Sequence, residues 1–276
     1  MQSVSDSTWS CSGFGLHAPN SDLRSGSGTY PIIYASPSGT ISVMLKMGVI
    51  VEMTVDRAVR VLCHDTFSSV WNSLGTSACI LHPNARIYQH DENVFCNFGT
   101  FPNPTYKMGT IVPGGVFFRM PHMPFAYMVS STAVRGTVAV YLEQNQFPAL
   151  SYDFTLAIFY AESMNGPEYA HVCNEVVKKA RHRRRRDGSI TLTINGIFIK
   201  QAVDGDVEVN LRPRYINCSP SKGTIRVHAD MVDMAAQEDN KAYAVRGMQR
   251  IHVSRSGLLA SDGRFVASID HTGRLI

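Results

Sequence analysis

The stretch ACILHPNARIYQHDENVFCNF, residues 78–98, decides the fold class because it holds short apolar segments separated by turn-forming residues. The segments ACILH, ARIYQH and NVFCNF are rich in aliphatic and aromatic side chains, and Pro83-Asn84 divides the first two. Proline and asparagine favour turns, whereas short runs of this kind bounded by turns favour strands. The stretch therefore predicts successive short strands.

The same pattern extends in both directions along the chain. GGVFFRM, FAYMVSS, GTVAVYLE and YDFTLAIFYAE continue it towards residue 162, and TYPIIYA and GTISVMLKMGVIVEM precede it. GSITLTINGIFIKQAV, GDVEVNLRPRYI and GTIRVHADMV follow residue 187. Strands at intervals of roughly ten residues are typical of an antiparallel sandwich or barrel. We therefore expect a mainly β protein, with α+β character only at the margins.

Two segments have the pattern of helices. Near residues 55–74, apolar side chains such as Val55, Val59 and Leu62 recur at spacings of three and four, and Gly75 follows. Near residues 167–186, Pro167 suits the first turn of a helix, and a cluster of basic residues complements the negative end of its dipole. The sequence therefore predicts two helices, with a third not excluded.

Composition indicates a folded chain with a basic second part. Of its 276 residues 44% are hydrophobic and 17% charged, which is enough apolar material for one large core or two modest ones. Residues 1–170 contain 8 Lys and Arg against 11 Asp and Glu, whereas the remainder contains 18 against 11. We expect an irregular arm over 1–30, a sandwich over 31–187 and a basic β-rich region over 188–276, with a boundary near Asp187.

The sequence contains no recognisable catalytic motif. It has neither a nucleophile elbow nor a phosphate-binding loop, so no enzymatic activity and no cofactor is expected. Hydrolysis and zinc-dependent catalysis stay as a third alternative, and the only candidate zinc ligands have poor spacing for a zinc knuckle. The apolar runs are too short to span a bilayer, and no secretion signal is apparent. The candidate zinc ligands are Cys79, His82, His90 and Cys96.

The segment EVVKKARHRRRRDG, residues 175–188, is the only dense block of charge. Its lysines can complement a helix dipole, but its arginines exceed what a helix end requires. A phosphate contact, a nuclear address, a protease site and a solvated helix end all remain open. We favour non-specific contacts with the backbone of nucleic acid, RNA in preference to DNA. The residues expected to make these contacts are Lys178, Lys179, Arg181, Arg183, Arg184, Arg185 and Arg186.

Residues 112–162 resemble the later strands of picorna-like virus capsid proteins. The matching positions are Met120-Pro121, Pro124, Gly136 to Leu142, Pro148 and Phe154 to Ala161. The resemblance implies a sandwich of jelly-roll type that assembles into a coat and contacts a genome, and it supplies no catalytic residue.

Together these observations favour a viral or virus-like structural protein that forms homo-oligomers and has no membrane span. Its expected location is the virion or the host cytoplasm, with the nucleus reached through the basic block. The alternative is a nuclear, regulatory or movement-type nucleic-acid-binding protein.

Overall fold

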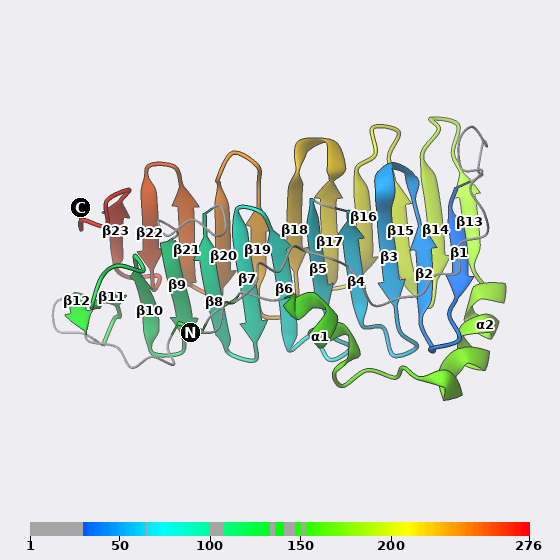
Figure 1. The fold of residues 1–276 in the computed structure, drawn as a ribbon, viewed down its shortest axis with the longest axis horizontal. Coiled ribbons are helices and arrows are strands. Elements are labelled where there is room, and N and C mark those ends of the chain that lie inside the picture. Colours follow the sequence, from blue (N-terminus) through cyan, green and yellow to red (C-terminus); the bar gives the residue numbers. More distant parts are fainter. Residues whose placement is uncertain are drawn as a thin grey trace, which may run out of the picture.

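The computed structural model describes residues 30–64, 66–99, 107–132, 136–140, 147–148, 150 and 153–276. These residues form two antiparallel β-sheets stacked face to face into an elongated slab (Figure 1). The fold class is therefore confirmed as mainly β with two antiparallel sheets and, in the described part of the chain, two α-helices. The arm predicted over residues 1–30 lies outside the described residues, apart from Tyr30.

The first sheet contains strands β1 to β12 in sequence order. Their bounds are β1 Ile32–Ala35, β2 Ile41–Met44, β3 Val49–Met53, β4 Val59–Cys63, β5 Phe67–Trp71, β6 Ser77–His82, β7 Ala85–His90, β8 Asn93–Phe98, β9 Lys107–Val112, β10 Gly115–Arg119, β11 Ala126–Val129 and β12 Thr137–Val140.

The second sheet contains strands β13 to β23, again in sequence order. Their bounds are β13 Arg181–Arg184, β14 Ile190–Ile194, β15 Ile197–Gln201, β16 Val207–Leu211, β17 Arg214–Ser219, β18 Thr224–His228, β19 Asp233–Ala236, β20 Ala242–Arg246, β21 Gln249–Ser254, β22 Gly257–Ser261 and β23 Val266–Asp270.

Each sheet is a meander, in which every strand pairs with its neighbours in sequence. The chain runs along the slab from β1 to β12, returns to its starting end through the two helices, and runs along it again from β13 to β23 (Figure 1). Strands β5, β8 and β9 accordingly contact β18, β20 and β21. This order differs from a jelly roll, in which distant strands pair through long connections.

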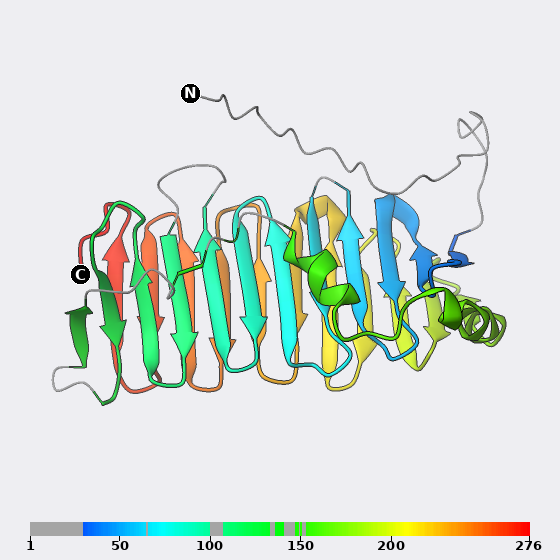
Figure 2. The same cartoon turned by 60° about the horizontal axis from the view of Figure 1, so that its bottom comes forward.

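Helix α1, Phe154–Tyr160, covers the outer face of the first sheet over β4, β5 and β6 (Figure 2). The carboxylate of Asp153 caps it by accepting a hydrogen bond from the backbone N–H of Thr155. Ile158 and Phe159 pack there into a second, smaller apolar cluster with Val70. The strand expected over residues 154–161 from the capsid resemblance is therefore wrong, because capping and this apolar docking site stabilise a helix.

The helix predicted near residues 55–74 is also wrong, because strands β4 and β5 occupy this range. Val59, Val61 and Cys63 alternate with half-buried residues, as expected of a strand with one face in the core. Strand β5 is buried on both faces, since the core lies on one side and α1 on the other. Because both faces of β5 are buried, its sequence does not alternate between apolar and polar residues. The apolar residues of β4 and β5 taken together therefore have the spacing of a helix.

The helix predicted near residues 167–186 is shorter than expected. A 3-10 turn, η3, spans Pro167–Tyr169 and α2 spans Ala170–Lys178, so the helix begins as predicted but ends before the arginines. The arginines form the edge strand β13 instead. The remaining 3-10 turns in the described part of the chain are η1 Lys46–Gly48 and η4 Pro220–Lys222.

Hydrogen bonds from side chains join the hairpins of one sheet to the hairpins of the other. The Gln201 side chain accepts from the Lys46 N–H and donates to the Lys46 carbonyl, both at 2.9 Å. Asn195 donates to the carbonyls of Thr54 and Val55 at 3.1 and 2.9 Å. Arg214, Asn84 and Gln249 make similar bonds to carbonyls of the opposite sheet. One continuous apolar cluster fills the space between the sheets, so the two sheets share one core.

No helix in the described part of the chain is long and apolar enough to cross a membrane.

Candidate functional site

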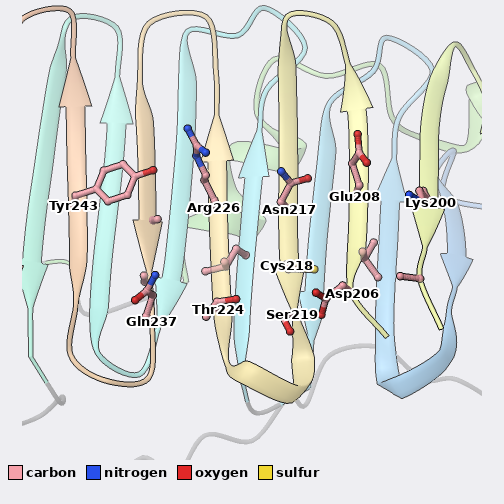
Figure 3. A pocket seen from close by; sticks show the side chains of 15 residues that line it. Lys200, Asp206, Glu208, Asn217, Cys218, Ser219, Thr224, Arg226, Gln237 and Tyr243 are labelled. Atoms are coloured by element: carbon pink, nitrogen blue, oxygen red, sulfur yellow. The ribbon is translucent and has the colours of Figure 1, made fainter. Parts of the chain in front are cut away.

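A groove crosses the outer face of the second sheet, at right angles to its strands (Figure 3). Its larger section, of about 530 Å³, extends over β15 to β20, and a smaller section of about 210 Å³ continues to β21. The two sections share Ala235, Gln237 and Tyr243. The other polar or charged residues that line them are Lys200, Asp206, Glu208, Asn217, Ser219, Thr224, Arg226, Lys241, His252 and Ser254.

Strand register sets the side of the groove on which each residue lies. Directly paired residues of antiparallel strands place their side chains on the same face. Successive pairings therefore form one row across the sheet, and its small member Ala235 leaves a gap between Arg226 and Tyr243. In strand order the row is Lys200, Glu208, Asn217, Arg226, Ala235, Tyr243 and His252.

Arg226 is held rigidly beside this gap. Its Nε and Nη2 atoms donate to the two carboxylate oxygens of Asp233 at 3.0 and 2.5 Å. Tyr243 donates to Asp233 at 3.2 Å, and the Arg226 guanidinium lies over the Tyr215 ring, 5.4 Å from its centroid. The hydrogen bond to Asp233 raises the pKa of Arg226 further above its ordinary value. This cluster gives the middle of the groove a fixed shape and balanced charge.

Aromatic rings stack in pairs along the same face. Tyr243 stacks on His252 with centroids 5.6 Å apart, and Tyr215 stacks on His228 at 5.0 Å. Burial and the nearby carboxylate of Asp233 raise the pKa of Tyr243 to about 12, so its hydroxyl stays protonated at neutral pH. Burial, together with Arg250, lowers the pKa of His252. Flat ring surfaces and hydrogen-bonding groups thus line this end of the groove, together with the charged side chain of Lys241.

The side chains that line the groove can bind a ligand mainly through hydrogen bonds and complementary shape. Asn217 and Gln237 carry both donors and acceptors, while Ser219 and Thr224 add hydroxyl groups. Cys218 alternates with Asn217 and belongs to the core between the sheets, where burial raises the pKa of its thiol, so it stays neutral. No group of three or more potential metal ligands occurs among the described residues.

The structure separates the four candidate zinc ligands. Cys79 lies under α1 in the small outer cluster, whereas Cys96 lies in the core between the sheets, so the two thiols occupy opposite faces of the first sheet. His82 is buried and bonded to the carbonyl of Gly223 at 2.9 Å, and His90 lies exposed at the other end of its hairpin. The structure does not bring these four residues together, because strand alternation directs the two cysteines to opposite faces of the sheet.

The seven basic residues predicted to contact nucleic acid lie together at one end of the slab. Lys178 ends α2 and forms an ion pair with Glu175, and Lys179 follows it. The five arginines lie in β13 and in the turn after it, and their residues are all exposed. Among the described residues, strand β13 pairs with β14 alone and forms the edge of its sheet. Charged side chains on an edge strand prevent pairing with other sheets, which gives the block a structural role.

These features define an elongated antiparallel β-sandwich protein in which, as far as the described residues go, both helices pack on the same sheet. The chain belongs to the family described as a domain of unknown function (DUF8796), whose model matches residues 31–276. No curated protein sequence matches the chain.

Among solved structures, the chain is similar to the TCP10 domain of CPAP from Danio rerio. The identity is 10%, with 89% of this chain and 96% of that one covered at a TM-score of 0.25. It is also similar to the SAS-4 TCP domain of Drosophila melanogaster, solved with a proline-rich motif of Ana2. Here the identity is 11%, with 76% and 97% covered at a TM-score of 0.28. Likeness at this level carries no function to the present chain.

The predicted resemblance to picorna-like capsid proteins over residues 112–162 is wrong, and so is the viral structural function inferred from it. Both sheets are meanders, and the expected last strand is helix α1. A nucleic-acid partner gains no support from these findings, and the roles assigned to the seven basic residues stay a prediction.

Sequence reasoning missed the groove altogether. Residues such as Asn217, Arg226 and Tyr243 alternate with buried neighbours in β17, β18 and β20, and that alternation marked them as outward-facing. It did not show that they share one row, because the register between strands was unknown.

Proposed function

We propose that the protein is a non-enzymatic binding protein that holds an extended segment of a partner polypeptide in the groove on its second sheet. One observation carries the proposal: the two sections of the groove share lining residues and together extend across seven strands, from β15 to β21, and polar side chains line both sections. Six intervals of about 4.8 Å give a length of roughly 29 Å, which an extended chain covers with about nine residues.

The shape of the groove favours a polypeptide over a small molecule. Small-molecule sites are concave and enclose most of their ligand, whereas this groove is open and long relative to the volumes of its two sections, about 530 and 210 Å³. Amide and hydroxyl side chains such as Asn217, Gln237 and Thr224 can bond to backbone groups of a partner. The stacked rings of Tyr243 and His252 offer apolar surface to its side chains.

Coverage of the two sheets supports the choice of face. Helix α1 packs on β4 to β6 and α2 packs on β1, so both helices contact the first sheet. The outer face of the second sheet has no such helix in the described part of the chain (Figures 1 and 2).

The test is selection of a random peptide library, with peptides of about 14 residues so that they exceed the groove, followed by affinity measurements on the selected peptides. In the variant Ala235→Trp a large ring fills the gap between Arg226 and Tyr243, and we expect at least a tenfold loss of affinity. The matched control is Ala139→Trp, which places the same ring at an exposed position in strand β12 of the first sheet, away from the groove. Selection of no peptide, or equal binding by Ala235→Trp and the native protein, would refute the proposal.

A further inference from the structure

We propose that the segment bound in the groove is acidic at one end, and that Arg181, Arg183 and Lys200 recognise this end and thereby fix the direction in which the segment lies. The inference rests on the proposed function and assigns a binding role to part of the basic block.

Strand register puts two of the arginines on the same face as the groove. Arg183 pairs with Thr191, which pairs with Lys200 at the groove's end, so these three side chains share the outer face. Arg181 pairs with Thr193 and lies on that face as well. The row that forms the groove therefore extends past Lys200 to the edge of the sheet.

The neighbouring residues His182 and Arg184 lie on the opposite face. They pair with Leu192 and Ile190, which are buried in the core. Although every residue of β13 is exposed, only alternate members can reach a ligand that lies across the outer face. The basic block is thus divided by strand alternation into two sets with different surroundings.

Charge is unbalanced where Arg181 and Arg183 lie, whereas Lys200 has Glu208 directly opposite it on the next strand and charge is balanced in the middle of the groove. Arg226 is paired with Asp233, and Asp206 faces Lys222 at 3.5 Å. Arg181 and Arg183 form no ion pair with any described residue. Carboxylates on a partner would supply the missing counter-charge, and complementary charge of this kind fixes the register of a complex.

The charge pattern favours an acidic peptide over nucleic acid. A nucleic acid carries a phosphate at every nucleotide, so along the groove it would meet the carboxylates of Glu208 and Asp206. A peptide can confine its negative charge to one end and present neutral or aromatic residues to Tyr243. From β13 to β20 there are seven strand intervals, or about 34 Å, so roughly ten residues separate the two ends of the contact.

The experiment compares two charge reversals at adjacent positions, Arg183→Glu and Arg184→Glu, which change the net charge equally but lie on opposite faces. The probes are the selected peptides whose binding Ala235→Trp abolishes, measured by fluorescence anisotropy. We expect these peptides to carry clustered Asp or Glu at one end, Arg183→Glu to weaken binding about fivefold, and Arg184→Glu to change it less than twofold.

Four results would overturn the inference. If Ala235→Trp abolishes binding but Arg183→Glu does not weaken it, the groove binds peptides and the acidic end is wrong. If both reversals weaken binding equally, strand alternation does not determine which arginines of β13 contact the peptide. If a single-stranded RNA of about 14 nucleotides displaces the peptides and binds in a manner sensitive to both reversals, the block is a polyanion site. If no peptide sensitive to Ala235→Trp is selected, the proposed function fails first and the inference fails with it.

Discussion

Replacing Gln201 by methionine tests the idea that side-chain amides join the two sheets. Gln201 is 1% exposed, and its amide makes two hydrogen bonds to the backbone of Lys46, both at 2.9 Å. Methionine keeps the volume, so no cavity forms and the loss comes from hydrogen bonding alone. Two bonds at about 0.5 to 1.5 kcal/mol each, with part of the cost of leaving their partners unpaired, give about 2 to 3 kcal/mol.

The measurement is urea unfolding followed by far-UV circular dichroism and by fluorescence of the buried Trp71. We expect the midpoint to fall while the slope stays constant, because the surface exposed on unfolding does not change. In thermal unfolding, the same loss lowers Tm by roughly 5 to 10 °C for a chain of this size.

The matched control is Gln249→Met, which removes one bond, from Gln249 Nε2 to the Val112 carbonyl at 2.7 Å. Gln249 is only half-buried, so this variant should lose about 1 kcal/mol. If Gln201→Met costs no more than Gln249→Met, the paired amide does not stabilise the contact between the sheets and the reasoning is wrong.

Two further predictions concern a titrating group and a tight turn. Burial lowers the pKa of His82 below 6.5, so its contribution to the free energy of unfolding is present above about pH 6.5 and is lost as the pH falls towards the folded-state value. Unfolding measured from about pH 8 to pH 5 should therefore show a weaker pH dependence in His82→Gln than in the native protein, and an unchanged dependence would contradict this. Gly39→Ala should cost about 2 kcal/mol or more in urea unfolding, because Gly39 has φ +76° and an added Cβ would lie 2.1 Å from the Gly166 carbonyl oxygen. The control is Gly48→Ala, where φ is +70° and an added Cβ would meet nothing within 4 Å, so only the conformational cost of about 1 kcal/mol is expected. If both variants lose the same free energy of unfolding, the clash with Gly166 does not contribute.

The fold class could be predicted because most strands have one buried face and one solvated face. Val207 and Val209 in β16 are buried and alternate with half-buried residues, so their period of two is visible in the sequence. The turn Asn195-Gly196 was equally readable, and both residues have positive φ, at 52° and 77°.

The failures have one physical origin, because each depends on contacts that the local sequence does not contain. Strand β5 lost its alternation since α1 packs on its outer face, and residues 154–160 form that helix because the sheet offers it an apolar docking site. The arginines of β13 form a strand through pairing with β14. Tertiary contacts thus overrode local propensity at these positions.

The groove could not be predicted from the pattern of any single strand. The meander topology nevertheless gives the residues of the groove a regular spacing in the sequence. When consecutive strands pair with short turns and little shift, residues of one row recur at nearly constant separation. Successive members of the row from Lys200 to His252 are eight or nine residues apart. A one-residue deletion within β18 would move its outward side chains into the core and remove Arg226 from the row. In this architecture the same strand register places apolar side chains in the core and polar side chains in the groove. A change that shifts the register therefore disrupts both the core and the groove.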